Sequence, residues 1–406
     1  MECLADSAGG IRLSLSGKSM SLAAAKTKAW GALYTFPSII LSALMISWAA
    51  EAAQFFISQG LALAILAWLQ TLPEFMVEAT IAWNRNVHLM TANITGSLRL
   101  LVGLGWPLVF FTTAAFRKAG SLEERFAPID FKDHHSIEIV AMIVPTLYFL
   151  LIYFKANLSL WDALVLILMY LAYLFLLRKT PCEDTEHADD LPAIPRRIVR
   201  MRPRWRNASI IALFVFGGAL LLYTIEPFLE SMMGLAVITG ISDFTFVQWC
   251  APFLTEFPEK LSAFKWARTV RGASMAMMNL ISSVINQWTM LAAMLPIVYS
   301  VSMGHPALIP FDGHQRTEIL LTIMQSGLAF LCLSRMRITV LGASSIFVLW
   351  LTQFIFPDTR EFLTFVYALL SILILIYFTA TKRKITVFSY FAAVCRTYGK
   401  RKESTS

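Results

Sequence analysis

Long apolar runs, each of about 20 residues, recur along most of the chain and are separated by short polar turns. A helix that crosses the hydrocarbon core of a bilayer needs about 20 apolar residues, so each run predicts a membrane-spanning helix. The pattern predicts eleven of these helices. They lie near residues 30–50, 55–83, 89–115, 136–154, 159–177, 208–226, 235–264, 273–303, 317–333, 338–356 and 361–380.

Two of these runs are interrupted by a proline that is followed directly by a glutamate. Pro73 and Glu74 stand in the second predicted helix, and Pro258 and Glu259 stand in the seventh. Proline cannot donate a backbone hydrogen bond and clashes with the preceding turn, so each helix should break there. An ionised carboxylate at the bilayer centre costs roughly 2–4 kcal/mol, and a break is tolerated only where it is buried in protein or lines a cavity. Both breaks are therefore candidate functional sites.

The polar residues that follow each break also repeat. Asn93 and Ser97 follow the first break, and Asn279 and Ser283 follow the second at nearly the same distance. A spacing of four places each asparagine and serine on one helix face. An odd number of predicted helices separates the two units, so they should cross the membrane in opposite directions. The sequence thus predicts an all-α polytopic membrane protein of about 10–11 helices, in two inverted repeats with proline-broken helices, a layout typical of transporters.

Polar segments divide this layout into parts. The segment at 179–207 contains a cluster of arginines, and the positive-inside rule predicts that it is a cytoplasmic loop. The predicted parts are an N-terminal segment (1–29), a first transmembrane half (30–178), this loop (179–207), a second transmembrane half with an extra C-terminal helix (208–380) and a basic cytoplasmic tail (381–406).

Composition excludes several classes of protein. Hydrophobic residues make up 57% of the chain, charged residues 15%, and the mean hydropathy is +0.64, so a soluble domain is excluded. The net charge of +8 does not indicate nucleic-acid binding, because the basic residues flank apolar runs. Five scattered cysteines form no metal-binding or disulfide pattern. We expect no cofactor and no obligate protein partner; the predicted partners are the lipid bilayer and small cations.

Each break also carries a second carboxylate. Glu78 follows Glu74 by four residues, and Glu256 precedes Glu259 by three, so each pair can share a helix face. Hard cations such as calcium bind six to eight oxygen ligands, with carboxylates supplying the negative charge. Two glutamates brought together would neutralise one divalent ion, or two monovalent ions or protons. The alternative is that these glutamates are protonated or paired and only hold helices together.

The two units resemble the alpha-repeats of the sodium/calcium exchanger family, within the calcium/cation antiporter superfamily. The repeats of that family combine Gly-Thr-Ser-x-Pro-Glu with a later Gly-Asn-x-x-Gly-Ser-Asn motif, and the resemblance covers about 60–110 and 245–300. It implies a secondary active antiporter that exchanges calcium for sodium or protons by alternating access. It also implies an integral membrane protein, expected in the bacterial inner (plasma) membrane.

The resemblance further implies a set of ion-binding residues. Glu74 and Glu259 match the glutamates that bind the metal ion, and we expect them to lie close together at mid-bilayer. Leu101 stands where the family has a polar ligand, which leaves the choice of ion open. The resemblance also implies as ligands the hydroxyls of Thr71, Thr255, Ser97 and Ser283, the amides of Asn93 and Asn279, and the carbonyl of Ala67. Three nearby residues that depart from the family pattern complete the expected set: Glu78, Glu256 and Gln287.

One basic residue interrupts the third predicted helix. Arg99 follows Ser97 by two residues. An unpaired guanidinium within the membrane costs roughly 2.5 kcal/mol or more, so it should bind an anion. We predict that Arg99 pairs with Glu78 or Glu256 and acts as an internal counter-ion, holding charge that a mobile ion would otherwise carry.

Three other functions are compatible with a polytopic membrane protein. The chain could be a family member that moves another cation or no longer transports; it could be an ion channel; or it could be an intramembrane enzyme. Inverted broken helices favour alternating access over a continuous pore. The sequence contains neither His-Glu-x-x-His nor Gly-x-Ser-x-Gly, so we predict that it is not an enzyme.

Overall fold

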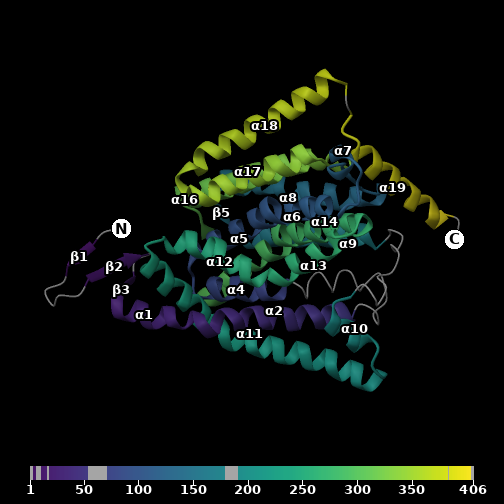
Figure 1. Cartoon of the computed structure of the whole chain (residues 1–406). Helices are drawn as coiled ribbons and strands as arrows, with labels where there is room; N and C mark the ends of the chain where they lie inside the picture. The colour runs from purple at the N-terminus through teal and green to yellow at the C-terminus, as the bar shows by residue number, and fades with distance from the viewer. Residues whose placement is uncertain are drawn as a thin grey trace. The chain divides into compact units, whose positions relative to one another are not determined.

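The computed structural model describes residues 3–5, 11–15, 18–53, 71–178, 191–382 and 384–403, which are mainly helical (Figure 1). The chain forms two compact units. Unit 1 comprises Met1–Ser97 and Asp184–Pro258, and unit 2 comprises Leu98–Glu183 and Glu259–Ser406. Each unit therefore combines segments from both halves of the chain.

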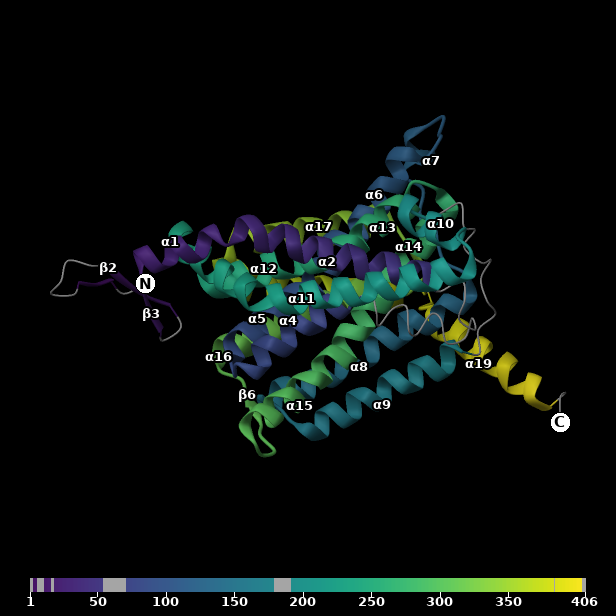
Figure 2. The ribbon, with the colours of Figure 1, turned by 90° about the horizontal axis from the view of Figure 1, so that it is seen from below.

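Unit 1 is built on long apolar helices that lie side by side. Helix α11 (Pro203–Thr239) packs along α1 (Leu22–Trp30) and α2 (Ala32–Ala53), as Figures 1 and 2 show. The Ser42 hydroxyl of α2 donates a hydrogen bond of 2.9 Å to the Gly217 carbonyl of α11. Small residues at such contacts let membrane helices approach closely, which increases the van der Waals contact between them.

Unit 1 also contains several shorter elements. They are the antiparallel strands β1 (Cys3–Ala5), β2 (Ile11–Leu15) and β3 (Lys18–Ser21), and the helices α4 (Leu72–Trp83), α5 (Val87–Leu100, up to Ser97), α10 (Ala193–Val199) and α12 (Asp243–Thr255). Helices α5 and α12 meet at Gly96, where an added Cβ would lie 1.8 Å from the Gln248 carbonyl oxygen. Only glycine fits at this crossing.

Unit 2 contains the remaining helices and two short antiparallel ladders. Helix α14 packs on α8 and α6, α9 packs on α15, and α16 packs on α8 and α18. The helices of unit 2 are η2 (Leu101–Gly105), α6 (Trp106–Phe116), α7 (Leu122–Arg125), η3 (Asp133–His135), α8 (Ser136–Lys155), α9 (Leu160–Leu177), α13 (Phe257–Ala267), α14 (Val270–Asn286), η4 (Gln287–Leu291), α15 (Ala292–Met303), α16 (Gly313–Leu333), α17 (Val340–Ile355), η5 (Pro357–Thr359), α18 (Arg360–Ala380) and α19 (Val387–Glu403). The ladders pair β4 (Ile129–Asp130) with β7 (Arg337–Ile338) and β5 (Asn157–Leu158) with β6 (Ile309–Pro310).

Within the described residues, eight helices are long and apolar enough to cross a membrane, and each coincides with one of the predicted helices. The predicted helix at 338–356 is the shorter α17, and the one at 55–83 is only partly described. The predicted end of one helix at residue 226 and the predicted start of the next at residue 235 were wrong. Helix α11 continues to Thr239, because Pro227 is accommodated inside it, and α12 begins only at Asp243.

Both proline breaks take the same local form. Pro73 is the second residue of α4, and Pro258 is the second residue of α13. The first backbone N–H groups of a helix have no partner within it, so proline is tolerated there. Glu74 and Glu259 consequently become the third residue of their helices, where the helix dipole favours negative charge. The predicted break at Pro258 is confirmed, because α12 ends at Thr255 and α13 begins at Phe257. The residues before Thr71 lie outside the described part of the chain, so the predicted break at Pro73 stays a prediction.

A π-helical turn marks the same place in each repeat. The turn η2 begins at Leu101, four residues after Ser97, and η4 begins at Gln287, four residues after Ser283. Such turns occur mostly inside α-helices and frequently at functional sites. No sequence motif predicts these turns, and their matching positions support the internal repeat at the level of the backbone.

The close packing of η2 gives a testable prediction. An added Cβ at Gly103 would lie 2.1 Å from the Trp350 side chain, whereas one at Gly327 in α16 would meet nothing within 4 Å. We expect Gly103→Ala to destabilise the protein by about 1–3 kcal/mol through overpacking. Gly327→Ala should be neutral or slightly stabilising, because alanine is the better helix former. Thermal unfolding in detergent measures both variants, and equal melting temperatures would contradict this packing.

Candidate functional site

Helices α4 and α5 form a hairpin whose polar side chains meet in pairs. The Ser97 hydroxyl of α5 donates a hydrogen bond to the Glu74 carboxylate of α4. One turn further along α4, the Glu78 carboxyl lies beside the Asn93 amide, although neither side chain has a hydrogen-bond partner within the described residues. All four side chains are buried. Helices α4 and α5 are antiparallel, so Glu74 lies opposite the later residue Ser97 and Glu78 lies opposite the earlier residue Asn93. The spacing of four residues on each helix therefore brings both carboxyls against α5.

A carboxylate from the second repeat joins the first pair. Glu256 is the residue at the break after α12, and its carboxylate contacts the same Ser97 hydroxyl as Glu74. The neighbouring Thr255 hydroxyl instead donates 3.0 Å to the Ala251 carbonyl of its own helix. We call Glu74, Ser97 and Glu256 the serine–carboxylate cluster.

The proton count of this cluster limits what it can bind. A serine hydroxyl has one hydrogen and can therefore donate to only one of the two carboxylates. The second contact requires a proton on Glu74 or Glu256, or a cation that both carboxylates share. Two ionised carboxylates this close would repel each other strongly, which also favours uptake of positive charge. The cluster is therefore suited to bind either protons or a hard cation.

Unit 2 repeats part of this arrangement. The Ser283 hydroxyl of α14 donates a hydrogen bond to the Glu259 carboxylate of α13. The position that corresponds to Glu78 is occupied by the buried Ala263, so this hairpin has one carboxyl where α4 has two. Within the described residues, the Asn279 Nδ2 atom has no hydrogen-bond partner. A polar atom of this kind is available to a ligand.

Of the other predicted site residues, some are described by the structure and one is not. Thr71 is buried at the start of α4, and Gln287 is buried at the start of η4. Ala67 lies outside the described residues. The expected meeting of Glu74 with Glu259 stays a prediction.

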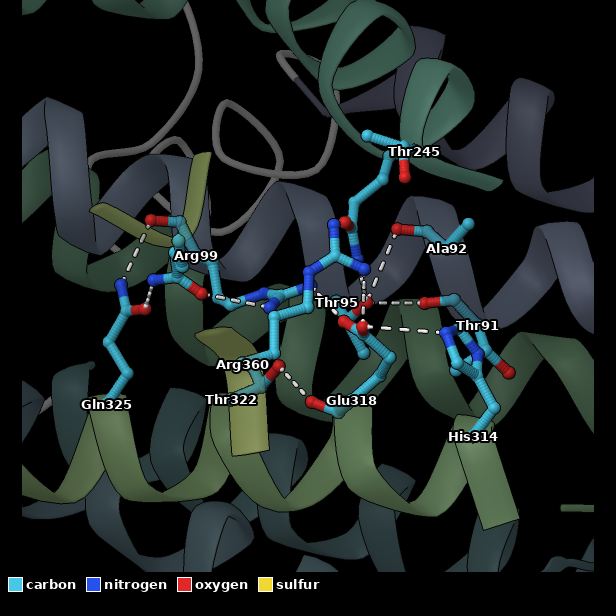
Figure 3. Close-up of polar contacts among 12 residues, drawn as sticks. Thr91, Ala92, Thr95, Arg99, Thr245, His314, Glu318, Thr322, Gln325 and Arg360 are labelled. Carbon is cyan, nitrogen blue, oxygen red and sulfur yellow. Dashed lines mark hydrogen bonds and ion pairs between the residues drawn. The ribbon is translucent and has the colours of Figure 1, made fainter. Parts of the chain in front are cut away.

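Arg99 pairs with a residue that the sequence analysis had not named. Its guanidinium binds the Glu318 carboxylate of α16 (Figure 3), so the predicted pairing with Glu78 or Glu256 was wrong. Arg99 is two residues past Ser97, or about 200° around the helix, so it projects away from the face that carries Ser97. The available signal was a lone glutamate near the start of a predicted membrane helix, with no motif around it.

Ion binding here must draw on more than carboxylates. In the described part of the chain, no group of three histidine, cysteine, aspartate or glutamate side chains is arranged to hold a metal ion. Two carboxylates supplemented by hydroxyl, amide and carbonyl oxygens are ligands that suit a hard cation.

Comparison with known proteins gives a family and a fold. The family described as "Sodium/calcium exchanger protein" matches residues 28–179 and 209–357. The chain is similar to a solved structure described as "Crystal Structure of H+/Ca2+ Exchanger CAX", with 34% identity over 92% of this chain and 91% of that one, and a TM-score of 0.81. Two structures of the sodium-calcium exchanger NCX_Mj share the fold of this chain at 18% sequence identity. The first match covers 82% of this chain with a TM-score of 0.51, and the second covers 81% with a TM-score of 0.52. Both matches cover 98% of the NCX_Mj chain. None of the curated sequences that were compared matches.

The geometry predicts unequal roles for the two serines. Ser97→Ala should weaken divalent-cation binding roughly tenfold or more, because a hydrogen bond to a charged group contributes about 1.5–3 kcal/mol. Ser283→Ala should have a smaller effect, since that hydroxyl contacts one carboxylate. Titration of the purified protein with Ca²⁺ measures both. The control is Ser42→Ala, a buried serine bonded to a backbone carbonyl, which should leave binding unchanged. Larger loss in Ser283→Ala than in Ser97→Ala would contradict the assignment.

Proposed function

We propose that this chain, which belongs to the sodium/calcium exchanger family, exchanges Ca²⁺ for protons across a membrane. Membership of the family makes it an integral membrane cation antiporter. The identity of the two exchanged ions is the proposal, as is the location in a bacterial inner membrane that the sequence resemblance implies. The mechanism involves no covalent step and no cofactor.

The observation that carries the proposal is the convergence of Glu74 and Glu256 on Ser97. When both glutamates are ionised, the cluster holds two negative charges, which one Ca²⁺ or two protons would neutralise. Both carboxylates are buried, at 2% and 4% exposed, so leaving them charged and empty is costly. The cluster should therefore give up one kind of ion only as it receives the other, which is the requirement for coupled exchange.

Protons suit the cluster better than sodium as the counter-ion. A sodium ion must be surrounded by several oxygen ligands, whereas a proton binds directly to one carboxylate oxygen. Leu101 is fully buried at a position where the resemblance implied a polar ligand, so the chain supplies one oxygen fewer. The similarity to a protein described as an H+/Ca2+ exchanger, at 34% identity, points to the same counter-ion.

The two broken helices supply the structural basis for alternating access. Glu74 and Glu259 each stand in the first turn of a helix that begins at a proline, and each accepts a hydrogen bond from a serine of the following helix. Transporters of this layout bind ions at such broken helices and expose them to the two sides in turn. We assign Glu74, Glu256 and Ser97 to binding of the exchanged ions, with Glu259 and Ser283 as the second set.

The exchange can be tested in reconstituted vesicles. A pH gradient should drive ⁴⁵Ca²⁺ uptake by the parent protein, with no requirement for sodium. Glu74→Gln and Glu256→Gln should each abolish uptake while leaving the protein folded, because each removes half of the charge that balances Ca²⁺. Glu226→Gln is the matched control: Glu226 lies exposed on α11 in the same unit, and uptake should persist.

Two results would overturn the proposal. Normal uptake by both Glu74→Gln and Glu256→Gln would refute the site. Uptake driven by a sodium gradient but not by a pH gradient would refute proton coupling while leaving the antiporter assignment in place.

A further inference from the structure

A second buried polar network lies in unit 2 and is centred on Arg99. One guanidinium nitrogen binds the Glu318 carboxylate (Figure 3), and another donates a hydrogen bond of 2.9 Å to the Gln353 side chain of α17. The other oxygen of Glu318 accepts a 2.6 Å hydrogen bond from Arg360, the first residue of α18. The side chains are 0% exposed for Arg99, 1% for Glu318 and 8% for Arg360. Glu318 thus binds a different arginine through each oxygen.

Two glutamines and a tyrosine hold Arg99 in place. The Gln325 amide donates 3.1 Å to the Arg99 backbone carbonyl, next to the π-helical turn η2. The Gln325 oxygen accepts hydrogen bonds from Gln353 at 2.8 Å and from the Tyr367 hydroxyl at 3.4 Å. Gln353 in turn contacts the guanidinium. The network therefore fixes both the backbone and the side chain of Arg99, because hydrogen-bonded polar networks in a protein interior are rigid.

The charges of this network do not cancel. Arg99 and Arg360 are positive and Glu318 is negative, so the three groups together carry one positive charge. His314, whose Nε2 atom lies 3.9 Å from Glu318, would add to that charge when protonated. A buried charge in a membrane protein is costly and usually marks a function.

The repeat shows that the local fold does not require this charge. Ser97 corresponds to Ser283, so the counterpart of Arg99 is the buried Ile285. Ile285 precedes the turn η4 as Arg99 precedes η2. Since the second repeat forms the same helix and the same π-helical turn with isoleucine, Arg99 serves something other than the backbone geometry.

Arg99 stands on the helix that supplies the shared hydroxyl of the serine–carboxylate cluster. It follows Ser97 by two residues within α5, a rise of roughly 3 Å along the helix axis. A fixed positive charge acts over long distances in a low-dielectric environment, so it opposes a further cation beside the Ca²⁺ that already neutralises both carboxylates. We propose that Arg99 is a specificity-determining residue whose fixed positive charge takes the place of one monovalent cation, so that the exchanger binds no sodium beside its Ca²⁺. This inference rests on the proposed function.

The network offers a matched pair of variants. Arg99→Gln and Arg360→Gln make the same chemical change at two arginines that share Glu318. Each leaves Glu318 with one arginine, as a neutral pair, so each variant loses one ion pair with Glu318. Arg99→Gln also loses the hydrogen bond from the guanidinium to Gln353. The two variants differ in where the positive charge is removed: Arg99→Gln removes it from α5, and Arg360→Gln removes it from α18. Arg99→Lys retains the charge but cannot reproduce the planar geometry of the guanidinium.

The experiment compares ²²Na⁺ binding by the purified proteins and ⁴⁵Ca²⁺ uptake into vesicles in sodium or choline chloride. Arg99→Gln should bind ²²Na⁺ about tenfold more tightly than the parent, because a repulsive unit charge is removed. Its Ca²⁺ uptake should become dependent on sodium. Arg360→Gln should stay within about twofold of the parent, and Arg99→Lys should keep the ion dependence of the parent even if its rate falls.

The outcomes separate this inference from the proposed function. Equal changes in sodium dependence for Arg99→Gln and Arg360→Gln, or no change in Arg99→Gln, would overturn it, since a purely structural role predicts similar effects. If Arg99→Gln fails to fold, the Arg99→Lys variant provides the test. Ca²⁺ uptake by Arg99→Lys that requires sodium would overturn the inference, whereas Ca²⁺ uptake with the ion dependence of the parent supports it. Absence of proton-driven Ca²⁺ uptake by the parent would instead contradict the proposed function.

Discussion

The structure depends on one constraint, which is that two buried carboxylates contact a single hydroxyl. Glu74 and Glu256 come from different repeats, and Ser97 can donate its hydrogen to only one of them. Positive charge must therefore accompany the pair, as a proton or as a cation. A site that cannot be empty and fully ionised within a membrane couples the departure of one ion to the arrival of another.

The surrounding helices are organised to create this contact. Pro73 starts a helix whose third residue is Glu74, the break after α12 exposes Glu256 at a helix end, and Gly96 lets α12 approach α5 closely enough to bring that end near Ser97. Arg99 projects from the opposite side of α5 and is held by Glu318. Helix periodicity thus places Ser97 and Arg99 on different sides of α5.

Much of this arrangement could be predicted from the sequence, because periodicity and proline have local effects. The apolar runs, both breaks and the Glu74–Ser97 and Glu259–Ser283 pairs were predictable from spacing and from the resemblance to a family. The partner of Arg99 was not, since it lies 219 residues away on a helix without a motif. The π-helical turns were equally hidden, because no residue type specifies them.

The most direct test of the account is the number of protons released when Ca²⁺ binds. Calorimetric titration of the purified protein in buffers of different ionisation enthalpy gives this number. Binding of a metal to protonated ligands releases their protons, so the parent protein should release about two per Ca²⁺ and Glu256→Gln about one. Ca²⁺ binding that releases no protons from the parent would contradict the claim that Glu74 and Glu256 hold protons or Ca²⁺ in alternation.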